Sequence, residues 1–517
     1  MQQPAKSSGH PKGLYVLFAT EMWERFNYYG MRAILFYFMT QALLIPNAKA
    51  SNLYGSYISL LYLTPLLGGY IADRYWGNKR SILVGGLIMA AGEGILFICA
   101  SLYDQMPDLS NILFFSGLGF MVAGNGFFKP NISSLVGQLY PKGDRRIDPA
   151  YTIFYMGINL GAAIGPIICG TVGNTGNPAD FKWAFLVGGI GMIISVIIQK
   201  KYHNKYVTSP EGEILGLTPG TPASQPGKTI SPVAAPPKFW LNPLFIITGM
   251  LVFGGVMIGA MFLDSQYNYL SYLLLGCTVV IAFLIFSDKT LTREERQRVI
   301  VMFIIAFFVV FFWAAYEQTG ASLSLFANEQ TNLNLWGSYH MPPAYFQSFN
   351  SVFIIIFAPI FAWLWLKLGK KQPATPSKMG IGLILLSLGY LWIAFGVSGV
   401  TPGVKVSIIW LTGMYLLHTW GELCLSPIGL SLFNKLSPIK FASLLMAVWF
   451  LGNAGGNKLA GVLSSLYPEN GRTTSFLGYQ MTSLYDFFML FVIMAGTAGV
   501  VLLLLSKRLQ KMMHGIS

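Results

Sequence analysis

The residues best suited to chemistry lie in the first apolar stretch of the chain. Glu21, Glu24, Arg25 and Arg32 stand there with apolar residues on both sides. Together with two tyrosines they follow the spacing i, i+3, i+4, i+7, i+8 and i+11, which places all six on one stripe of a helix. A charge at bilayer depth costs about 2.5–3.5 kcal/mol on insertion scales, so these side chains are predicted to pair or to line a wet cavity. The alternative, charges at the membrane surface that only anchor the helix, fits the flanking apolar residues less well.

The composition indicates a membrane protein with many helices. Of the 517 residues, 54% are hydrophobic and only 10% are charged, whereas a soluble domain carries about 25% charged residues. Long apolar runs recur from end to end, unlike the short alternating segments of a β-barrel. No cleavable signal is expected before the first run. The four cysteines lie far apart within apolar runs, so we expect neither a disulfide framework nor a metal site.

Fourteen membrane spans are predicted, so the fold class is an all-α polytopic membrane protein. The first six cover 14–41, 52–75, 80–101, 110–136, 148–172 and 181–200. Two more cover 240–263 and 268–287, and the last six cover 297–327, 345–367, 379–398, 405–434, 441–466 and 481–506. Two six-span units joined by a linker are typical of the major facilitator architecture, in which two halves face a central cavity.

The predicted domains follow from this pattern. A stretch rich in Pro, Gly, Ser and Thr at 202–238 has no apolar periodicity, so it is predicted to be an extended or mobile cytoplasmic linker. It separates a six-helix bundle at 1–201 from a two-helix insertion at 239–288 and a second six-helix bundle at 289–517. The insertion carries almost no charge within its apolar runs, which favours a peripheral packing or spacer role.

Lysine and arginine gather on one side of the predicted topology. With the N-terminus inside, the outer loops hold only Lys49, Lys182, Lys405 and Arg472. This bias predicts that both termini are cytoplasmic. It explains the net charge of +14 as topology, with attraction to anionic membrane lipid as a secondary effect, and argues against nucleic-acid binding.

The loop between the second and third spans, from Gly68 to Arg80, is similar to the loop motif of major facilitator proteins. Asp73 and Arg74 are followed by Gly77 and closing basic residues. Asp73 could cap a neighbouring helix end and pair with Arg74 or Arg80 across a hinge that opens and closes. The alternative is a solvated tight turn.

Few other polar residues lie at membrane depth, and each is a functional candidate. They are Glu93, Lys129, Asn159, Glu317, Asn350, Glu422 and Lys458. Lys129 lies mid-span, which fits a functional role better than snorkelling to an interface. Glu93 stands between glycines, which favours a helix-packing hydrogen bond over a substrate role, and Lys458 is ambiguous between the two.

The charges of the two predicted halves are complementary. Arg25, Arg32 and Lys129 come from the first half, and Glu317 and Glu422 come from the second. A zwitterion with a carboxylate at one end and an ammonium at the other would fit between them, or the same charges could pair directly and close a gate. Aromatic walls for such a site could come from Tyr28, Tyr29, Tyr62, Tyr155, Trp313 and Trp449.

Several separated motifs resemble the proton-coupled oligopeptide transporter (POT) family. The Glu-x-x-Glu-Arg motif at Glu21–Arg25 is followed by Tyr29 and Arg32, and Phe154–Gly161 is similar to the family signature Phe-Tyr-x-x-Ile-Asn-x-Gly. Further matches lie in 69–80, 313–318, 347–350 and 422–427. The two-span insertion and the short loop 399–404 resemble the bacterial type. One departure is Gly161-Ala162-Ala163, where many members have Gly-Ser.

The resemblance implies a role for each matching residue. Arg25, Arg32 and Lys129 would meet a peptide carboxylate, Glu422 its amino terminus, and Asn159 and Asn350 its backbone. The pocket lining would be Tyr29, Tyr62, Tyr155, Trp313, Ser426 and Trp449. Proton coupling would involve Glu21, Glu24, Arg25 and Glu317. The gate would use the pairs Lys129–Glu422 and Arg32–Glu317, with Asp73 and Arg74 at the hinge.

The resemblance therefore implies a proton-coupled symporter that imports di- and tripeptides by alternating access in a bacterial cytoplasmic (inner) membrane. It would need no cofactor because the proton gradient drives it. The alternative is another small anionic or zwitterionic solute, such as nitrate. An enzyme is not favoured, since no Ser/His/Asp constellation or paired metal motif stands at membrane depth, and nothing resembles the filter of a channel. The sequence leaves the oligomeric state open.

Overall fold

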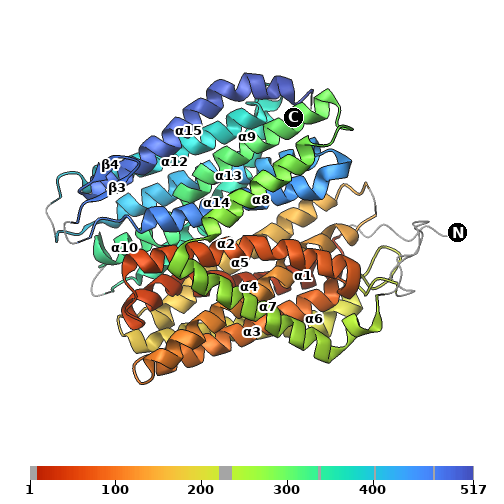
Figure 1. Cartoon of the computed structure of the whole chain (residues 1–517), viewed down its shortest axis with the longest axis horizontal. Helices are drawn as coiled ribbons and strands as arrows, with labels where there is room; N and C mark the ends of the chain where they lie inside the picture. Colours follow the sequence, from red (N-terminus) through yellow and green to blue (C-terminus); the bar gives the residue numbers. More distant parts are fainter. Residues whose placement is uncertain are drawn as a thin grey trace. The chain divides into compact units, whose positions relative to one another are not determined.

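The computed structural model describes residues 9–141, 143–220, 236–335, 339–400, 403–469 and 472–515. Fourteen long helices account for most of this part of the chain (Figure 1). The first six are α1 (Lys12–Tyr37), α2 (Asn47–Ile71), α3 (Asn78–Leu102), α4 (Pro107–Gln138), α5 (Ile147–Gly173) and α6 (Phe181–Tyr206). These bounds confirm the first six predicted spans to within a few residues.

The remaining long helices also follow the predicted order. They are α7 (Pro243–Tyr267), α8 (Leu270–Phe286), α9 (Arg293–Tyr316), α11 (Phe346–Leu368), α12 (Thr375–Val397), α13 (Ile408–Leu436), α14 (Ala442–Ser464) and α15 (Leu484–Met512). In the described residues, nine helices are long and apolar enough to cross a membrane by length and composition alone. The helix α1 is not among them because Glu21, Glu24, Arg25 and Arg32 interrupt its apolar run.

One predicted span is interrupted. The span predicted at 297–327 ends as an α-helix at Tyr316, continues as a tight turn over Glu317–Gly320, and resumes as the short helix α10 (Ser322–Glu329). Gln318 fixes this break. Its amide nitrogen donates to the carbonyls of Ala314 (2.9 Å) and Ala460 (3.1 Å), and its amide oxygen accepts from Ser322 and Ser464 (2.6 Å each).

The fold is not purely helical. Two residues of β1 (Thr331–Asn332) pair in parallel with β2 (Val406–Ser407), and β3 (Thr474–Phe476) forms a hairpin with β4 (Tyr479–Met481). The hairpin turns through Leu477 and Gly478, both with positive φ, as a tight two-residue turn requires. These strands are too short to change the all-α class.

The chain packs as two compact units. The first contains residues up to Ile34 and Leu63–Ala260, and the second contains Leu35–Tyr62 and Met261–Ser517. The ends of α1 and the beginning of α2 therefore pack with the later helices, and the two-helix insertion contributes to both units. The domain boundaries expected at 201, 238 and 288 stay predictions, but these packing units are divided differently.

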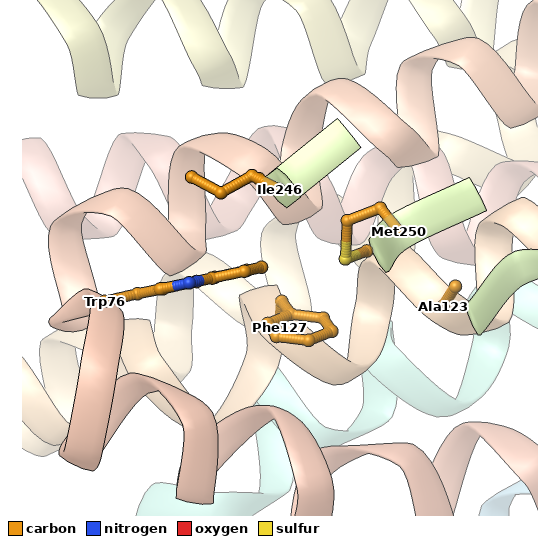
Figure 2. Packing of buried hydrophobic residues seen from close by; sticks show 5 residues of the cluster. All are labelled: Trp76, Ala123, Phe127, Ile246 and Met250. Atoms are coloured by element: carbon orange, nitrogen blue, oxygen red, sulfur yellow. The ribbon is translucent and has the colours of Figure 1, made fainter. Parts of the chain in front are cut away.

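In the first unit, α3 packs along α4 and α6, and the beginning of α7 lies against α4. Figure 2 shows Trp76 and Phe127 beside Ile246 and Met250 of α7, and all four side chains are buried. In the second unit, α12 packs against α13 and α15, and α14 packs against α8 and α9.

The beginning of the linker is not the extended tether that the sequence predicts. The helix α6 runs on to Tyr206, after which Thr208 pairs with Ile214 in a tight antiparallel bridge. His203 on α6 bonds the Leu215 carbonyl at 2.9 Å, which fixes this turn to its helix. A short polar segment can fold in this way because side chains and backbone satisfy each other locally. Residues 221–235, the centre of the predicted linker, lie outside the described residues.

Candidate functional site

The acid–base stripe of α1 forms a compact cluster in the first unit. The Nε of Arg25 lies 2.8 Å from Glu21 Oε1 and 2.9 Å from Glu24 Oε2. All three side chains are buried, with exposed fractions of 2% for Glu21, 0% for Glu24 and 4% for Arg25. This confirms that the four-residue spacing brings acid and base together, because residues one turn apart share a helix face.

Neighbouring groups extend the cluster. Asn125 on α4 donates to Glu24 Oε1 at 3.4 Å, and the positive charge of Lys129, one turn further along α4, also acts on Glu24. The guanidinium of Arg25 lies 5.7 Å from the ring of Tyr28. Two carboxylates thus share two cations in a buried cluster. A change in the charge or position of one member therefore changes the protonation equilibria of the others.

Arg32 lies two turns beyond Arg25 on the same helix. Its guanidinium carbon is 6.0 Å from the centre of the Tyr29 ring, a distance at which cation and aromatic face attract each other. Arg32 is 7% exposed, and Tyr29 is half-buried. The other first-unit candidates lie on α5: Asn159 is buried and donates to the Tyr155 carbonyl at 2.9 Å, while Tyr155 is exposed.

The second unit holds the acidic candidates. Glu422 on α13 accepts two hydrogen bonds at Oε2, from the Tyr316 hydroxyl at 2.6 Å and from Asn350 Nδ2 at 2.9 Å. Asn350 on α11 also donates to the hydroxyl of Thr419 at 3.2 Å. Among the described residues, no hydrogen bond reaches the second carboxylate oxygen of Glu422, so this oxygen can accept from a ligand.

Glu317 begins the tight turn after α9 and is buried, and its negative charge acts on Glu422. Trp313, one turn earlier, is buried with its indole nitrogen lacking a hydrogen-bond partner in the described chain. Trp449 on α14 is buried beside Phe433 at a ring distance of 5.1 Å, and Ser426 on α13 is half-buried. Tyr62, also half-buried, lies on α2.

Two predicted gate pairs stay predictions. Lys129–Glu422 and Arg32–Glu317 each join residues that belong to different units. The structure brings Lys129 near Glu24 in the first unit and Glu317 near Glu422 in the second. Each unit therefore assembles its own part of the candidate site.

The expected ion pairs of the loop motif do not form in this structure. Asp73 and Arg74 are exposed, and in the described part of the chain neither makes an ion pair. These two residues lie in a π-helical turn over Ala72–Trp76, which ends at Gly77 with φ +73, a conformation that favours glycine. The proposed hinge role of Asp73 and Arg74 is untested.

This loop is instead held by the beginning of the linker and by the segment that leads into α7. Lys79 donates its backbone N–H to Gly216 O at 2.9 Å, and the Trp76 indole donates to Trp240 O at 3.1 Å. The rings of Tyr75 and Trp240 stack at 4.1 Å. Sequence reasoning could not find these contacts, because they join segments that are far apart in the chain.

Glu93 has the packing role that its glycine neighbours suggest. It is fully buried on α3 and accepts from Asn27 Nδ2 of α1 at 2.7 Å. Asn27 lies on α1 between the charged residues but turns away from their stripe. This hydrogen bond ties α1 to α3 and so helps to fix the orientation of the acid–base cluster.

The buried residue that sequence reasoning missed is Asp264. It lies one residue beyond the predicted end of the seventh span, and its exposed fraction is 3%. Its partner is Lys458 on α14, with Nζ 2.6 Å from Asp264 Oδ2. A lysine isolated at membrane depth requires an acid partner, so Lys458 was the sequence feature that could have pointed to a buried acid such as Asp264.

The candidate site consists of charged side chains that are buried inside long apolar helices. Such buried ionisable groups are typical of substrate and proton pathways in membrane proteins.

Comparison with known proteins gives the family. A profile described as the POT family matches residues 79–206 and 248–482, and the chain belongs to this family of transporters. The chain is 34% identical to the uncharacterized transporter YclF of Bacillus subtilis, an alignment that covers 98% of this chain and 96% of the relative. It is 32% identical to a di-/tripeptide transporter of Lactococcus lactis subsp. cremoris, covering 98% and 97%.

The solved structures agree with this assignment. A crystal structure described as peptide transporter POT in complex with sulfate is similar with a TM-score of 0.81 and 32% identity, covering 98% of this chain and 97% of that one. The chain therefore has the major facilitator type of fold, with α7 and α8 as additional helices, and it is a multi-pass membrane protein.

Proposed function

We propose that the chain is a proton-coupled symporter that imports di- and tripeptides by alternating access. The observation that carries this proposal is the Glu21–Arg25–Glu24 cluster, buried in α1 of a chain that matches di-/tripeptide transporters over nearly its full length. The acids supply a place for a proton, and the cations beside them supply a place for a carboxylate.

The charges suggest how proton and peptide would be coupled. Glu21 and Glu24 carry two negative charges, and Arg25 and Lys129 balance them. A peptide carboxylate that bound to Arg25 or Lys129 would compete with Glu24 for these cations. Glu24 would then take up a proton more readily, because it would have lost part of its electrostatic partner. Binding a proton and a carboxylate together leaves the total charge of the cluster unchanged.

The second unit would bind the other end of the peptide. Tyr316 and Asn350 fix one oxygen of Glu422, and the other oxygen would accept from the peptide ammonium. Asn159 and Asn350 would hold the peptide backbone, with Tyr29, Tyr62, Tyr155, Trp313, Ser426 and Trp449 as the lining. Glu317 would act as a further proton site near Glu422. Support comes from a solved POT family transporter in complex with 5-aminolevulinic acid, which is 31% identical with a TM-score of 0.78.

The setting would be the cytoplasmic membrane of a bacterium with both termini inside, as the distribution of Lys and Arg indicates. The proton gradient would provide the driving force, so the proposal includes no cofactor. Reporter fusions at each end of the chain test the orientation.

The transport experiment uses purified protein in proteoliposomes with an inward proton gradient. Labelled di-, tri- and tetrapeptides and nitrate are offered separately. We expect the di- and tripeptides to accumulate inside the vesicles above their equilibrium concentration. This accumulation should be lost when a protonophore dissipates the proton gradient. Accumulation of nitrate instead would support the alternative substrate class, and peptide uptake without dependence on the gradient would contradict proton coupling.

A further inference from the structure

A buried polar cluster in the second unit, which the proposed mechanism does not use, connects α2, α7 and α14. Asp264 Oδ2, near the end of α7, accepts from Lys458 Nζ on α14 at 2.6 Å and from the hydroxyl of Ser56 on α2. Lys458 also donates to Ser56 Oγ at 2.9 Å. The exposed fractions are 1% for Ser56, 3% for Asp264 and 2% for Lys458.

Asp264 also builds the turn of the two-helix insertion. Its other carboxylate oxygen, Oδ1, accepts the backbone N–H of Leu270 at 2.8 Å, at the start of α8. Its carbonyl accepts the N–H of Asn268, which has a left-handed φ of +52. One carboxylate therefore fixes the turn between α7 and α8 and attaches that turn to α2 and α14.

The ion pair lies beside an open hollow of the second unit. This hollow has a volume of about 530 Å³, lies between α8, α9 and α14, and is lined by Leu274, Leu275, Phe307, Leu451 and Lys458 among others. Lys458 thus borders a space that the insertion leaves open, and its charged hydrogen bond to Asp264, which is stronger than a neutral one, attaches the insertion at this position.

The cluster stands beside a close contact between α2 and α14. A Cβ added to Gly55 would lie 2.8 Å from the Cα of Gly461, so the two backbones approach too closely for any side chain. Ser59, one turn further along α2, donates to Ala454 O at 2.9 Å. Close backbone approach at glycines and a side-chain hydrogen bond to a carbonyl therefore contribute to this contact.

We propose that Ser56, Asp264 and Lys458 form a latch through which the two-helix insertion holds residues 47–62 of α2 against α14. The latch resists separation of this contact and thereby sets how often α2 and α14 part during the transport cycle, a role that rests on the proposed transport function. The insertion is then a brace for a moving contact, in place of the peripheral spacer expected from its apolar sequence.

The test measures amide hydrogen exchange of the full-length protein in lipid nanodiscs, which requires no substrate. The variant Asp264→Asn/Lys458→Met removes both charges, so neither partner is left as an unpaired buried ion. The matched control is Asp288→Asn/Lys440→Met, which removes another Asp–Lys pair of the second unit from an exposed site. A second comparison sets Ser56→Ala against Ser59→Ala, since both serines bond across the same helix contact.

We expect exchange in residues 47–62 to rise at least fivefold in the Asp264/Lys458 variant and less than twofold in the Asp288/Lys440 control. Ser56→Ala should raise exchange more than Ser59→Ala. The charge-reversed variant Asp264→Lys/Lys458→Asp should restore protection at least in part. Unchanged exchange in the Asp264/Lys458 variant, or an equal rise in its control, would overturn the latch.

Transport kinetics then show whether the latch acts in the cycle. In proteoliposomes the maximal rate of dipeptide exchange should change at least threefold in the Asp264/Lys458 variant, with less than a twofold change in the half-saturating concentration. A change confined to half-saturation would contradict the latch. If the unaltered protein transports no peptide, the proposed function fails, while the exchange experiment still decides whether the latch exists.

Discussion

The acids that the two units contribute to the candidate site are stabilised in different ways. In the first unit, Glu21 and Glu24 are paired with Arg25 on the same helix at 2.8 and 2.9 Å. In the second unit, Glu422 receives its hydrogen bonds from Tyr316 and Asn350, which are neutral and come from two other helices. The first arrangement pairs charged residues of one helix. The second joins an acid to neutral donors that come from other helices.

This difference separates the two jobs that a coupled transporter must perform. Acids that share a cation respond to anything that competes for that cation, which suits proton coupling. An acid held by neutral donors from two other helices keeps a fixed orientation, which suits recognition of an ammonium group. The contrast also predicts that the two units respond unequally when a single charge is removed.

The largest effect is expected from Arg25→Met. The substitution leaves Glu21 and Glu24 buried without their closest cation, and removal of one member of a buried ion pair typically costs about 3–5 kcal/mol. Thermal unfolding in detergent should show a large loss of stability, and peptide uptake should disappear. Glu21→Gln/Arg25→Met, which removes one charge of each sign, serves as the control and should recover part of the stability. Equal stability of Arg25→Met and the unaltered protein would show that the cluster is not the charged unit described above.

The next effect concerns coupling at Glu317. Glu317→Gln keeps size and hydrogen-bonding capacity but cannot release a proton, so uphill uptake driven by a proton gradient should be lost while counterflow exchange continues. Both activities are measured in the same proteoliposomes. Proton-driven accumulation that persists in this variant would exclude Glu317 as the coupling residue.

A smaller loss of stability is expected from Glu422→Gln. Tyr316 and Asn350 can still donate to the amide oxygen, so the cost should be near that of one neutral hydrogen bond, about 1 kcal/mol. Binding of a dipeptide should weaken more than tenfold, because a hydrogen bond to a charged group contributes about 1.5–3 kcal/mol. Calorimetric titration with a dipeptide and with its N-acetylated form, which lacks the ammonium group, measures how much that group contributes to binding. The variant should no longer discriminate between them, and retained discrimination would exclude Glu422 as the ammonium partner.

The smallest effect lies outside the membrane, in the loop between α4 and α5. Arg146 donates to both carboxylate oxygens of Asp144, the shortest distance being 2.7 Å, and these hydrogen bonds lower the pKa of Asp144 to about 2. Because the pKa is lower in the folded protein, the contribution to stability is present above the ordinary pKa near 4 and is lost as the pH falls towards 2.

Asp144→Asn should therefore lower the melting temperature slightly at pH 6, and the difference from the unaltered protein should shrink between pH 4 and pH 2. Melting temperatures recorded over this range provide the test. A difference that is independent of pH would mean that the Asp144–Arg146 pair does not contribute through its charge.

The sequence predicted those features that depend on local spacing. The stripe of Glu21, Glu24 and Arg25 follows from helix geometry, and the fourteen long helices follow from apolar runs. The donors to Glu422 could not be predicted from spacing, because Tyr316 is 106 residues and Asn350 is 72 residues away in the chain. Both lie on other helices that only tertiary packing brings close to Glu422.

Asp264 illustrates the other limit. The hydropathy pattern ended the seventh span at 263, which left this acid in an apparent loop and its partner Lys458 unexplained. The structure carries the helix on to Tyr267 and buries both charges together. The linker is similar: its polar composition suggested a tether, whereas His203 bonds the Leu215 carbonyl and Gly216 accepts from Lys79, which attach the beginning of the linker to the first unit.

The break in α9 has a consequence for how a proton could be gained or lost there. Gln318 is anchored by carbonyls on one side and hydroxyls on the other, so the backbone next to Glu317 cannot shift without breaking several bonds at once. The Glu317 carboxylate can then change partners only by rotation of its own side chain or by the approach of another charged group. In the proposed transport cycle, the charges that approach Glu317 would therefore set how readily it takes up a proton.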